Sequence, residues 1–158
     1  MPELPAYRAV IEPAWIDYNG HVRDAYYGLA ASYAIDAAMD HLGLDARYRE
    51  STSCTLYTLE MHLHYLHEIK ASDHLHIVTS ILDFDRKRIH AGCTFTLPRL
   101  KDAAATADLM LLHVHQGVKP AAAPFPDPVV AALGALKVSG AARGAFGPSS
   151  RKIELQHR

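Results

Sequence analysis

The segment WIDYNGHVRDAYY, residues 15–27, combines side chains that are able to do chemistry. Asp17 precedes an Asn-Gly-His turn sequence, and a helix-like apolar pattern follows at once. A carboxylate can act as a general base or as a nucleophile, and the N-terminus of a helix offers unpaired N–H groups and a positive dipole end. Asp followed by Asn-Gly is also a common turn composition, in which the Asp side chain only caps the backbone. The segment alone leaves the catalytic and the structural interpretation open.

Histidines are a second group with possible chemistry. The chain has 11 of them, and they include three H-x-H pairs, at 62/64, 74/76 and 113/115. In a strand, period two places both members of such a pair on one face, and imidazole is a common ligand of zinc and iron. Polar residues belong on the outer face of a sheet in any case. We therefore predict no metal site.

Composition indicates a single soluble globular domain. The chain has 158 residues, with 16 basic and 17 acidic side chains, so it has no basic field for nucleic acid and no acidic interaction arm. The N-terminus shows no signal-peptide pattern, and no apolar stretch is long enough to cross a bilayer. Cys54 and Cys93 are far apart and form no CxxC motif. We expect reduced thiols, a cytoplasmic location, and neither nucleic acid nor membrane as a partner.

A long buried helix is predicted over residues 23–42. Small and polar residues fall four apart along it, at Gly28, Ser32, Asp36 and Asp40, and nearly every other position is apolar. This spacing places one narrow polar stripe on the helix surface and leaves the rest of the surface to be covered. Gly43 is typical of a helix C-terminus. The pattern predicts a central helix that other elements enclose.

Strands are predicted to enclose this helix. Residues 56–66 alternate, with Tyr57, Leu59, Met61, Leu63 and Tyr65 on one face and polar residues on the other. Further strands are predicted at 74–84, 88–97 and 106–115, with a short first strand within 7–13. The fold class is therefore α+β, a curved antiparallel sheet of about five strands around one long central helix.

A short C-terminal element follows this domain. We assign residues 1–126 to the main domain and residues 127–158 to a short helix with a flexible tail. Asp127 is suited to the N-cap of that helix and Pro128 to its first position, and the helix is expected to end near Lys137.

This order of elements, with DYNGHVRDAYY at the strand-to-helix junction, resembles the hotdog-fold acyl-CoA thioesterases of the 4-hydroxybenzoyl-CoA thioesterase type. The resemblance covers about residues 6–118 and also rests on TLEMHLHYLHEI, DFDRKRIH and TADLMLLHV. Within the family the chain is most similar to the betainyl-CoA thioesterase group of carnitine breakdown. Two positions depart from the usual pattern, Arg23 where Asn is common and Asp108 where Glu is common. Arg23 lies at the predicted helix mouth, where it could alter the pocket.

The resemblance implies roles for the opening segment. Asp17 would be the nucleophile or the general base on water, and both mechanisms remain open. The backbone N–H groups of Arg23 and Asp24 would be the oxyanion donors. Asn19 would orient Asp17 or contact the thioester, and His21 would position the turn or the substrate.

Substrate contacts follow from the same resemblance. Betaine carries a quaternary ammonium group, which aromatic faces attract. The candidates for this contact, most of which also suit the core, are Trp15, Tyr18, Tyr26, Tyr57 and Tyr65. Glu60 or Glu68 could add negative charge, although a solvated or ion-paired role suits both as well. Arg86, Lys87 and Arg88 form a basic turn that suits the phosphates of coenzyme A, and an ordinary solvated turn is an equal alternative.

We therefore predict a thioester hydrolase that acts on a small acyl-CoA, with betainyl-CoA as the expected substrate. An aryl- or medium-chain acyl-CoA thioesterase, a non-catalytic acyl-CoA-binding hotdog module and a metal-binding β-rich protein are the alternatives. No cofactor is expected, because coenzyme A is part of the substrate. The resemblance also implies a homodimer or a dimer of dimers, whose sites combine Asp17 with residues such as Lys87 or Glu60 of the partner subunit.

Overall fold

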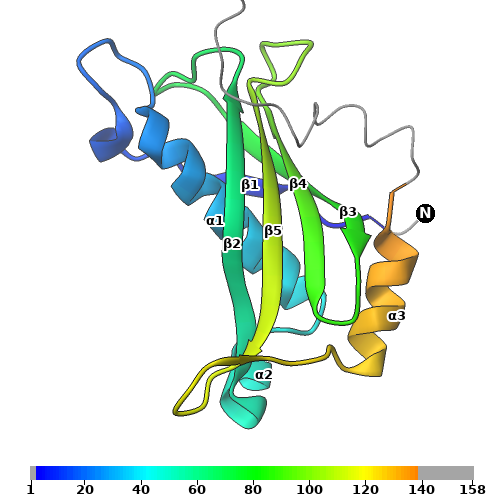
Figure 1. Cartoon of the computed structure of the whole chain (residues 1–158). Coiled ribbons are helices and arrows are strands. Elements are labelled where there is room, and N and C mark those ends of the chain that lie inside the picture. The colour runs from blue at the N-terminus through cyan, green and yellow to red at the C-terminus, as the bar shows by residue number, and fades with distance from the viewer. Residues whose placement is uncertain (1–2, 139–158) are drawn as a thin grey trace, which may run out of the picture.

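The computed structural model describes residues 3–138 and shows one antiparallel sheet with a long helix across one face (Figure 1). The strands lie in the order β1-β3-β4-β5-β2, and β6 pairs with the end of β5. This arrangement confirms the predicted α+β architecture. The elements in chain order are β1 (Tyr7–Ala9), the 3₁₀ turn η1 (Pro13–Trp15), α1 (Asp24–His41), α2 (Ala46–Thr52), β2 (Cys54–Tyr65), β3 (Leu75–Phe84), β4 (Arg88–Thr96), β5 (Ala105–His115), β6 (Ala121–Ala122) and α3 (Asp127–Leu136).

Helix α1 is the central helix that the polar stripe predicts. Ser32, Asp36 and Asp40 are exposed, whereas Ala30, Ala31, Ala34 and Ala38 are buried. Alanine lets the helix approach the sheet closely, and the opposing face of the sheet supplies large side chains, which include Ile77, Ile81, Ile89 and Phe95. Gly43 ends the helix region in the left-handed conformation with φ +78°, as expected for a C-terminal glycine.

Strand β2 contains a β-bulge. Its pairing with β5 shifts from Thr58 opposite Leu111 to Glu60 opposite Met110, so Leu59 is the extra residue. Cross-strand partners share a face, and Tyr57 lies opposite Leu112, whereas Tyr65 lies opposite the buried Ala105. The prediction of one continuous apolar face from Tyr57 to Tyr65 is therefore wrong at Tyr57. The bulge moves Tyr57 to the outer face, while Met61, Leu63 and Tyr65 face the side of α1.

Two helices complete the body. Helix α2 was not expected from the sequence, and its Tyr48 hydroxyl hydrogen-bonds the buried His113 ring at 2.9 Å. Helix α3 confirms the predicted helix, although Pro126 rather than Asp127 occupies the N-cap. Val129 and Leu133 of α3 belong to the common core. The flexible tail predicted after this helix lies outside the described residues.

Both cysteines are free and buried, and no helix within residues 3–138 is long and apolar enough to cross a membrane.

Candidate functional site

The Asp17 segment forms a tight turn at the mouth of α1. The Asp17 N–H donates to the His21 carbonyl at 2.9 Å, and the Gly20 N–H donates to the Asp17 carbonyl at 3.0 Å. Gly20 has φ +77°, a conformation that glycine adopts at no steric cost. One step further along the same short ladder, the Arg23 N–H donates to the Trp15 carbonyl at 2.8 Å. Asp17 is two residues along this extended segment from Trp15, which pairs with the residue before α1. The Asp17 backbone is therefore roughly 7 Å from the start of α1.

The Asp17 carboxylate has one engaged oxygen and one available oxygen. Its Oδ1 accepts the backbone N–H groups of Asn19 at 2.8 Å and His21 at 3.3 Å. Among residues 3–138, no donor hydrogen-bonds its Oδ2. The structural interpretation of Asp17 is thus correct as far as Oδ1 is concerned. It does not exclude the catalytic one, because the turn orients a half-buried carboxylate whose second oxygen can meet a substrate or a water.

A loop after β2 supports this turn from the side. The Val22 N–H donates to the Ile69 carbonyl at 2.7 Å. Arg99, in the turn between β4 and β5, holds this loop: it donates to both carboxylate oxygens of Asp73 at 2.7 and 2.9 Å and to the Glu68 carbonyl at 2.6 Å. The Arg99 hydrogen bonds hold the pKa of Asp73 below its usual value, so this carboxylate stays ionised.

The first turn of α1 offers fewer donors than the sequence predicts. The Arg23 N–H is occupied by the Trp15 carbonyl, so the structure does not support Arg23 as an oxyanion donor. The Ala25 N–H is bound by the Asp24 side chain at 2.9 Å. The Asp24 N–H, in contrast, has no acceptor among residues 3–138. One backbone donor at the positive end of an 18-residue helix therefore remains for a ligand.

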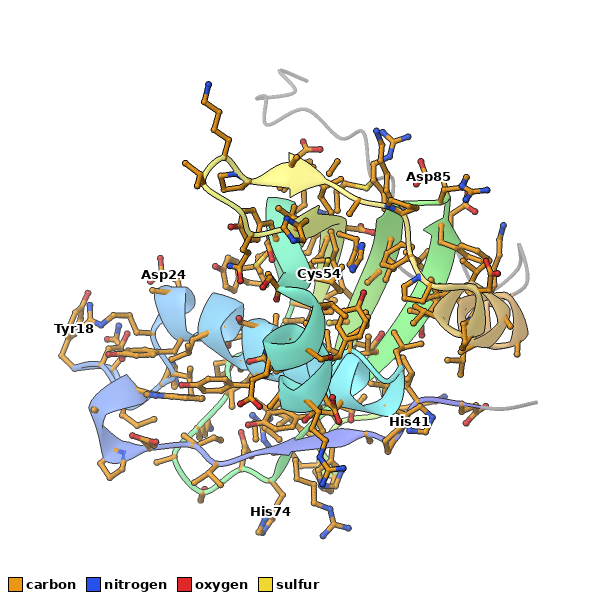
Figure 2. The ribbon with its side chains drawn as sticks, turned by 90° about the horizontal axis from the view of Figure 1, so that it is seen from below. Tyr18, Asp24, His41, Cys54, His74 and Asp85 are labelled. Atoms are coloured by element: carbon orange, nitrogen blue, oxygen red, sulfur yellow. The ribbon has the colours of Figure 1, made fainter. Side chains whose placement is uncertain are left out.

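The predicted aromatic residues separate into buried and open ones. Trp15 is only 4% exposed and stacks on Tyr26 with ring centroids 5.4 Å apart, so it belongs to the core that supports the helix mouth. Tyr18 is 90% exposed at the tip of the turn, at the same end of the molecule as Asp24 (Figure 2). Tyr65 is half open, and its hydroxyl donates to the Asp24 carbonyl at 3.2 Å. Of the two open rings, Tyr65 is the one that hydrogen-bonds the start of α1.

The basic hairpin between β3 and β4 lies at the end of the sheet opposite to the helix mouth. Tyr65 of β2 and Phe95 of β4 both pair with Ala105 of β5, so they lie at the same height in the sheet. Arg88 precedes Phe95 by seven positions in β4. At about 3.3 Å per residue, the hairpin is about 23 Å from the helix mouth along the strands. All three cations are exposed, but Arg88 forms an ion pair with Asp85 at 2.6 Å, so Arg86 and Lys87 are the better candidates for binding phosphate. A single subunit does not bring them to Asp17.

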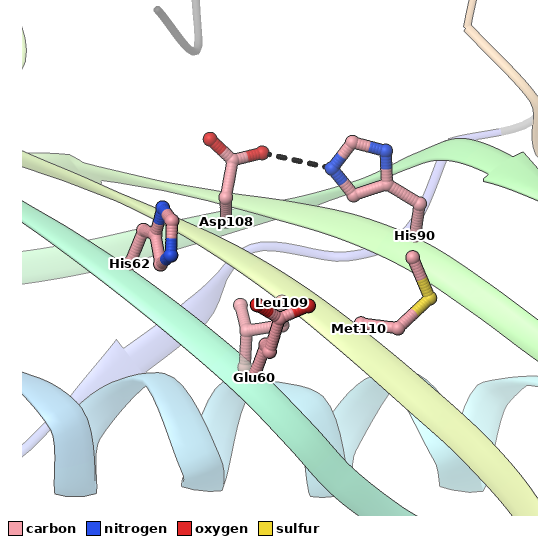
Figure 3. Close-up of a pocket in the computed structure, with 6 residues that line it drawn as sticks. All are labelled: Glu60, His62, His90, Asp108, Leu109 and Met110. Carbon is pink, nitrogen blue, oxygen red and sulfur yellow. Dashed lines mark hydrogen bonds and ion pairs between the residues drawn. The ribbon is translucent and has the colours of Figure 1, made fainter. Parts of the chain in front are cut away.

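The outer face of the sheet carries a second candidate site. Glu60, His62, His90, Asp108 and Met110 border a shallow depression of about 270 Å³ on the face away from α1 (Figure 3). His90 Nε2 lies 3.0 Å from Asp108 Oδ1, and their side chains are 27% and 10% exposed. This His–Asp pair resembles acid–base machinery. Because Glu60 borders this depression on the face away from α1, it cannot contact a substrate at Asp17 of its own chain.

The outer depression lacks the groups that would make it a metal centre or an anion site. Within residues 3–138, no three His, Cys, Asp or Glu side chains come together in an arrangement that could hold a metal ion. Asp108 lies on β5, which is paired with β2 on one side and β4 on the other, so the backbone N–H groups there serve the sheet. This pair could not be read from the sequence, because the contact joins residues 18 positions apart.

The void between the C-terminal half of α1 and the sheet is small. The void among Ile35, Met39, Leu56 and their neighbours has a volume of about 10 Å³. This is close to the minimum that holds one water molecule. An acyl chain cannot enter the core along this path without displacing the packed side chains of α1.

The family model and the curated relatives that match this chain are all thioesterases or contain a thioesterase. The model of the thioesterase-like superfamily matches residues 11–133. A betainyl-CoA thioesterase of Pseudomonas aeruginosa is 44% identical over 133 residues, which are 84% of this chain and 83% of that protein. An L-carnitine dehydrogenase/betainyl-CoA thioesterase of Agrobacterium fabrum is 37% identical over 111 residues, which are 70% of this chain and 22% of that longer protein.

Solved structures give the same result for the fold. A Staphylococcus aureus protein solved in complex with CoA has a TM-score of 0.81 at 26% identity and covers 96% of this chain and 94% of its own. A Pseudomonas putida protein provisionally described as a thioesterase has a TM-score of 0.80 at 40% identity, over 99% of both chains.

Proposed function

Because the chain belongs to the thioesterase-like superfamily and is an acyl-CoA thioesterase, we propose that it hydrolyses betainyl-CoA in carnitine breakdown. In this proposal Asp17 and the Asp24 N–H act on opposite sides of the thioester carbonyl. The observation that carries the proposal is the pairing of a turn-fixed carboxylate with an unpaired helix N–H. It occurs in a chain whose similarity to a betainyl-CoA thioesterase extends over most of both sequences.

The chemistry follows from these two groups. As a nucleophile or a water attacks the carbonyl carbon, negative charge develops on the carbonyl oxygen. The Asp24 N–H and the positive end of the α1 dipole stabilise that charge. The free Oδ2 of Asp17 either attacks the carbon itself, which displaces the coenzyme A thiolate and leaves a mixed anhydride that water then hydrolyses, or removes a proton from the attacking water, and the departing thiolate takes up that proton. Both forms of the mechanism use the same carboxylate in the same position.

The packing beside the C-terminal half of α1 favours a small acyl group over a long one. The void of about 10 Å³ between α1 and the sheet has no room for a chain of methylene groups. A betainyl group is compact, and it can remain at the helix mouth. Medium-chain acyl groups would need another path, and aryl groups would need a wider opening at the mouth.

We further propose that two chains associate through β2, as a homodimer that could pair again into a dimer of dimers. This strand has 12 residues and lies at the edge of the sheet, where no other strand among residues 3–138 pairs with its free side. Leu59 in this strand and Leu66 directly after it expose about half of their surfaces. A long exposed edge with apolar side chains favours pairing with another strand.

Antiparallel pairing of two β2 strands would also give the basic hairpin a role. Such pairing reverses the partner, so the hairpin end of its sheet comes to the Asp17 end of the first chain. Three strand spacings, about 14 Å, would separate β2 of one subunit from β4 of the other. Arg86 and Lys87 of the partner subunit could then bind the phosphates of the coenzyme A whose thioester lies at Asp17.

A comparison of substrates tests the acyl assignment. We expect kcat/KM for betainyl-CoA to exceed that for butyryl-CoA and benzoyl-CoA by at least tenfold. A preference for butyryl- or benzoyl-CoA would overturn the betainyl assignment and leave the thioesterase class intact. Sedimentation of the purified chain tests the dimer, which requires at least twice the mass of one chain; a single-chain mass would overturn it.

A further inference from the structure

The helix mouth contains an aromatic ring that is both accessible and held in place. Trp15 and Tyr27 are each 4% exposed, and Tyr26 has one face covered by Trp15. Tyr18 is exposed, but no ring contact fixes it among residues 3–138. Tyr65 is 52% exposed and makes fixed contacts. An accessible ring that is already ordered binds a ligand at a lower entropic cost than a free one.

Two contacts hold Tyr65 at the first turn of α1. Its hydroxyl donates to the Asp24 carbonyl at 3.2 Å. Its ring also meets Tyr27 in an edge-to-face arrangement, with centroids 5.0 Å apart and an angle of 78° between the planes. Tyr27 is itself anchored, since it is buried and its hydroxyl donates to the His67 carbonyl at 3.4 Å. The ring therefore stands beside the residue whose N–H is the proposed oxyanion donor.

Negative charge accompanies this ring. Burial raises the pKa of Tyr65, and the nearby Asp24 carboxylate raises it further, so the phenol stays neutral and remains a donor. Asp24 is exposed, with Oδ1 on the Ala25 N–H. Glu68 is less suitable as an anion for a ligand. Its own backbone N–H keeps its pKa low, and Lys70, His21 and Arg99 act in the same direction, so cations already surround it.

We propose that the face of Tyr65, assisted by the Asp24 carboxylate, recognises a quaternary ammonium group on the acyl part of the substrate. This inference rests on the proposed function. In a betainyl thioester the cationic nitrogen is two bonds from the carbonyl carbon. A carbonyl oxygen at the Asp24 N–H would therefore place the cation beside the residue that anchors Tyr65. A cation attracted by the electron-rich face of an aromatic ring is a recognised binding mode for such groups.

A neutral substrate of the same shape isolates the charge. The probe is 3,3-dimethylbutyryl-CoA, in which carbon replaces the quaternary nitrogen of betainyl-CoA. The measured quantity is the ratio of kcat/KM for betainyl-CoA to that for this analogue. We expect Tyr65→Leu and Tyr65→Met to lower the ratio by roughly 3- to 30-fold, the range of a cation over a ring. Tyr65→Phe keeps the ring and should keep the ratio within about threefold.

The control is Tyr33→Leu. Tyr33 lies farther along α1, its ring is 42% exposed, and like Tyr65 it contacts another tyrosine ring. It should leave the ratio unchanged. Asp24→Asn retains an acceptor for the Ala25 N–H and should lower the ratio by about twofold at low salt, with the effect lost at high salt.

Each outcome has a defined meaning. A ratio in Tyr65→Leu and Tyr65→Met within a factor of two of the wild-type ratio would overturn the role of Tyr65, even if both rates fell together. Hydrolysis of neither substrate by the wild-type protein would instead overturn the proposed function. A wild-type preference for the neutral analogue would overturn the acyl assignment.

Discussion

Asp17 and Asp108 are two carboxylates that a side-chain inspection alone would rank in the wrong order. Asp108 is the more buried, and a histidine nitrogen lies 3.0 Å from it. Asp17 is half-buried in a turn, and its hydrogen-bond partners among residues 3–138 are backbone groups. The two sites differ in the backbone around them. Asp108 stands in the middle of paired strands, whereas Asp17 stands at a helix start that leaves the Asp24 N–H unpaired. A developing oxyanion needs such a donor, and a sheet interior has none to offer.

The largest effect is expected from Asp17, and two substitutions separate its chemistry from its turn. Asp17→Asn keeps an oxygen that can accept the Asn19 and His21 N–H groups, so it should fold with unchanged stability. Its kcat/KM should nevertheless fall by about 10²–10⁴-fold, because the amide is neither a base nor a nucleophile. Asp17→Ala should show the same loss of activity together with about 1 kcal/mol of lost stability. Full activity in Asp17→Ala would mean that Asp17 only shapes the turn.

The next effect concerns the support of the Asp17 turn by Asp73. The pKa of Asp73 is lowered in the folded state, chiefly by Arg99, so the ionised form stabilises the fold above the unfolded pKa of about 3.9. That contribution is lost as the pH falls through the lower folded pKa. Asp73→Asn should therefore cost about 2 kcal/mol at pH 7 and flatten the stability curve below about pH 4. Urea unfolding across this pH range measures it; identical curves for both proteins would contradict the predicted role of the ion pair.

A smaller effect is expected at the hairpin end, where Arg86 and Lys87 face solvent. Replacing both with Glu should raise KM for an acyl-CoA by about tenfold at low salt, and added salt should reduce the difference. The matched control is Arg8→Glu on β1, an exposed arginine at the far edge of the sheet. An equal rise of KM in the control would indicate a general charge effect rather than a phosphate site.

The smallest effect is expected at Asp108. Asp108→Asn removes the negative charge that faces His90 and should lower the free energy of unfolding by about 1 kcal/mol. The kcat/KM should stay within about threefold of the wild-type value. Thermal unfolding and steady-state hydrolysis measure the two quantities. A large loss of activity with unchanged stability would move the active site to the outer face.

The sequence predicts the fold well because the decisive signals are local. The polar stripe from Gly28 to Asp40 identifies α1, and the alternation in each apolar segment identifies the four long strands. The Asn-Gly turn after Asp17 is equally local. All of these features depend on residues within a few positions of one another.

The site is predicted less completely because its details depend on distant partners. Alternation continues through Leu59 without a visible break, so the bulge that turns Tyr57 to the outer face leaves no signal in the sequence. The occupied N–H of Arg23 follows from a ladder with Trp15 that only the folded turn shows. The Arg99–Asp73 pair joins residues 26 positions apart.

Hydrolysis of betainyl-CoA by Asp17→Asn and Asp108→Asn, assayed side by side with the wild-type protein, shows which carboxylate is the reactive one. We expect Asp17→Asn to retain about 1% of the wild-type kcat/KM or less and Asp108→Asn to remain within about threefold of it. A folded Asp17→Asn protein with near wild-type activity, beside an inactive Asp108→Asn protein, would assign the reaction to the outer face of the sheet instead.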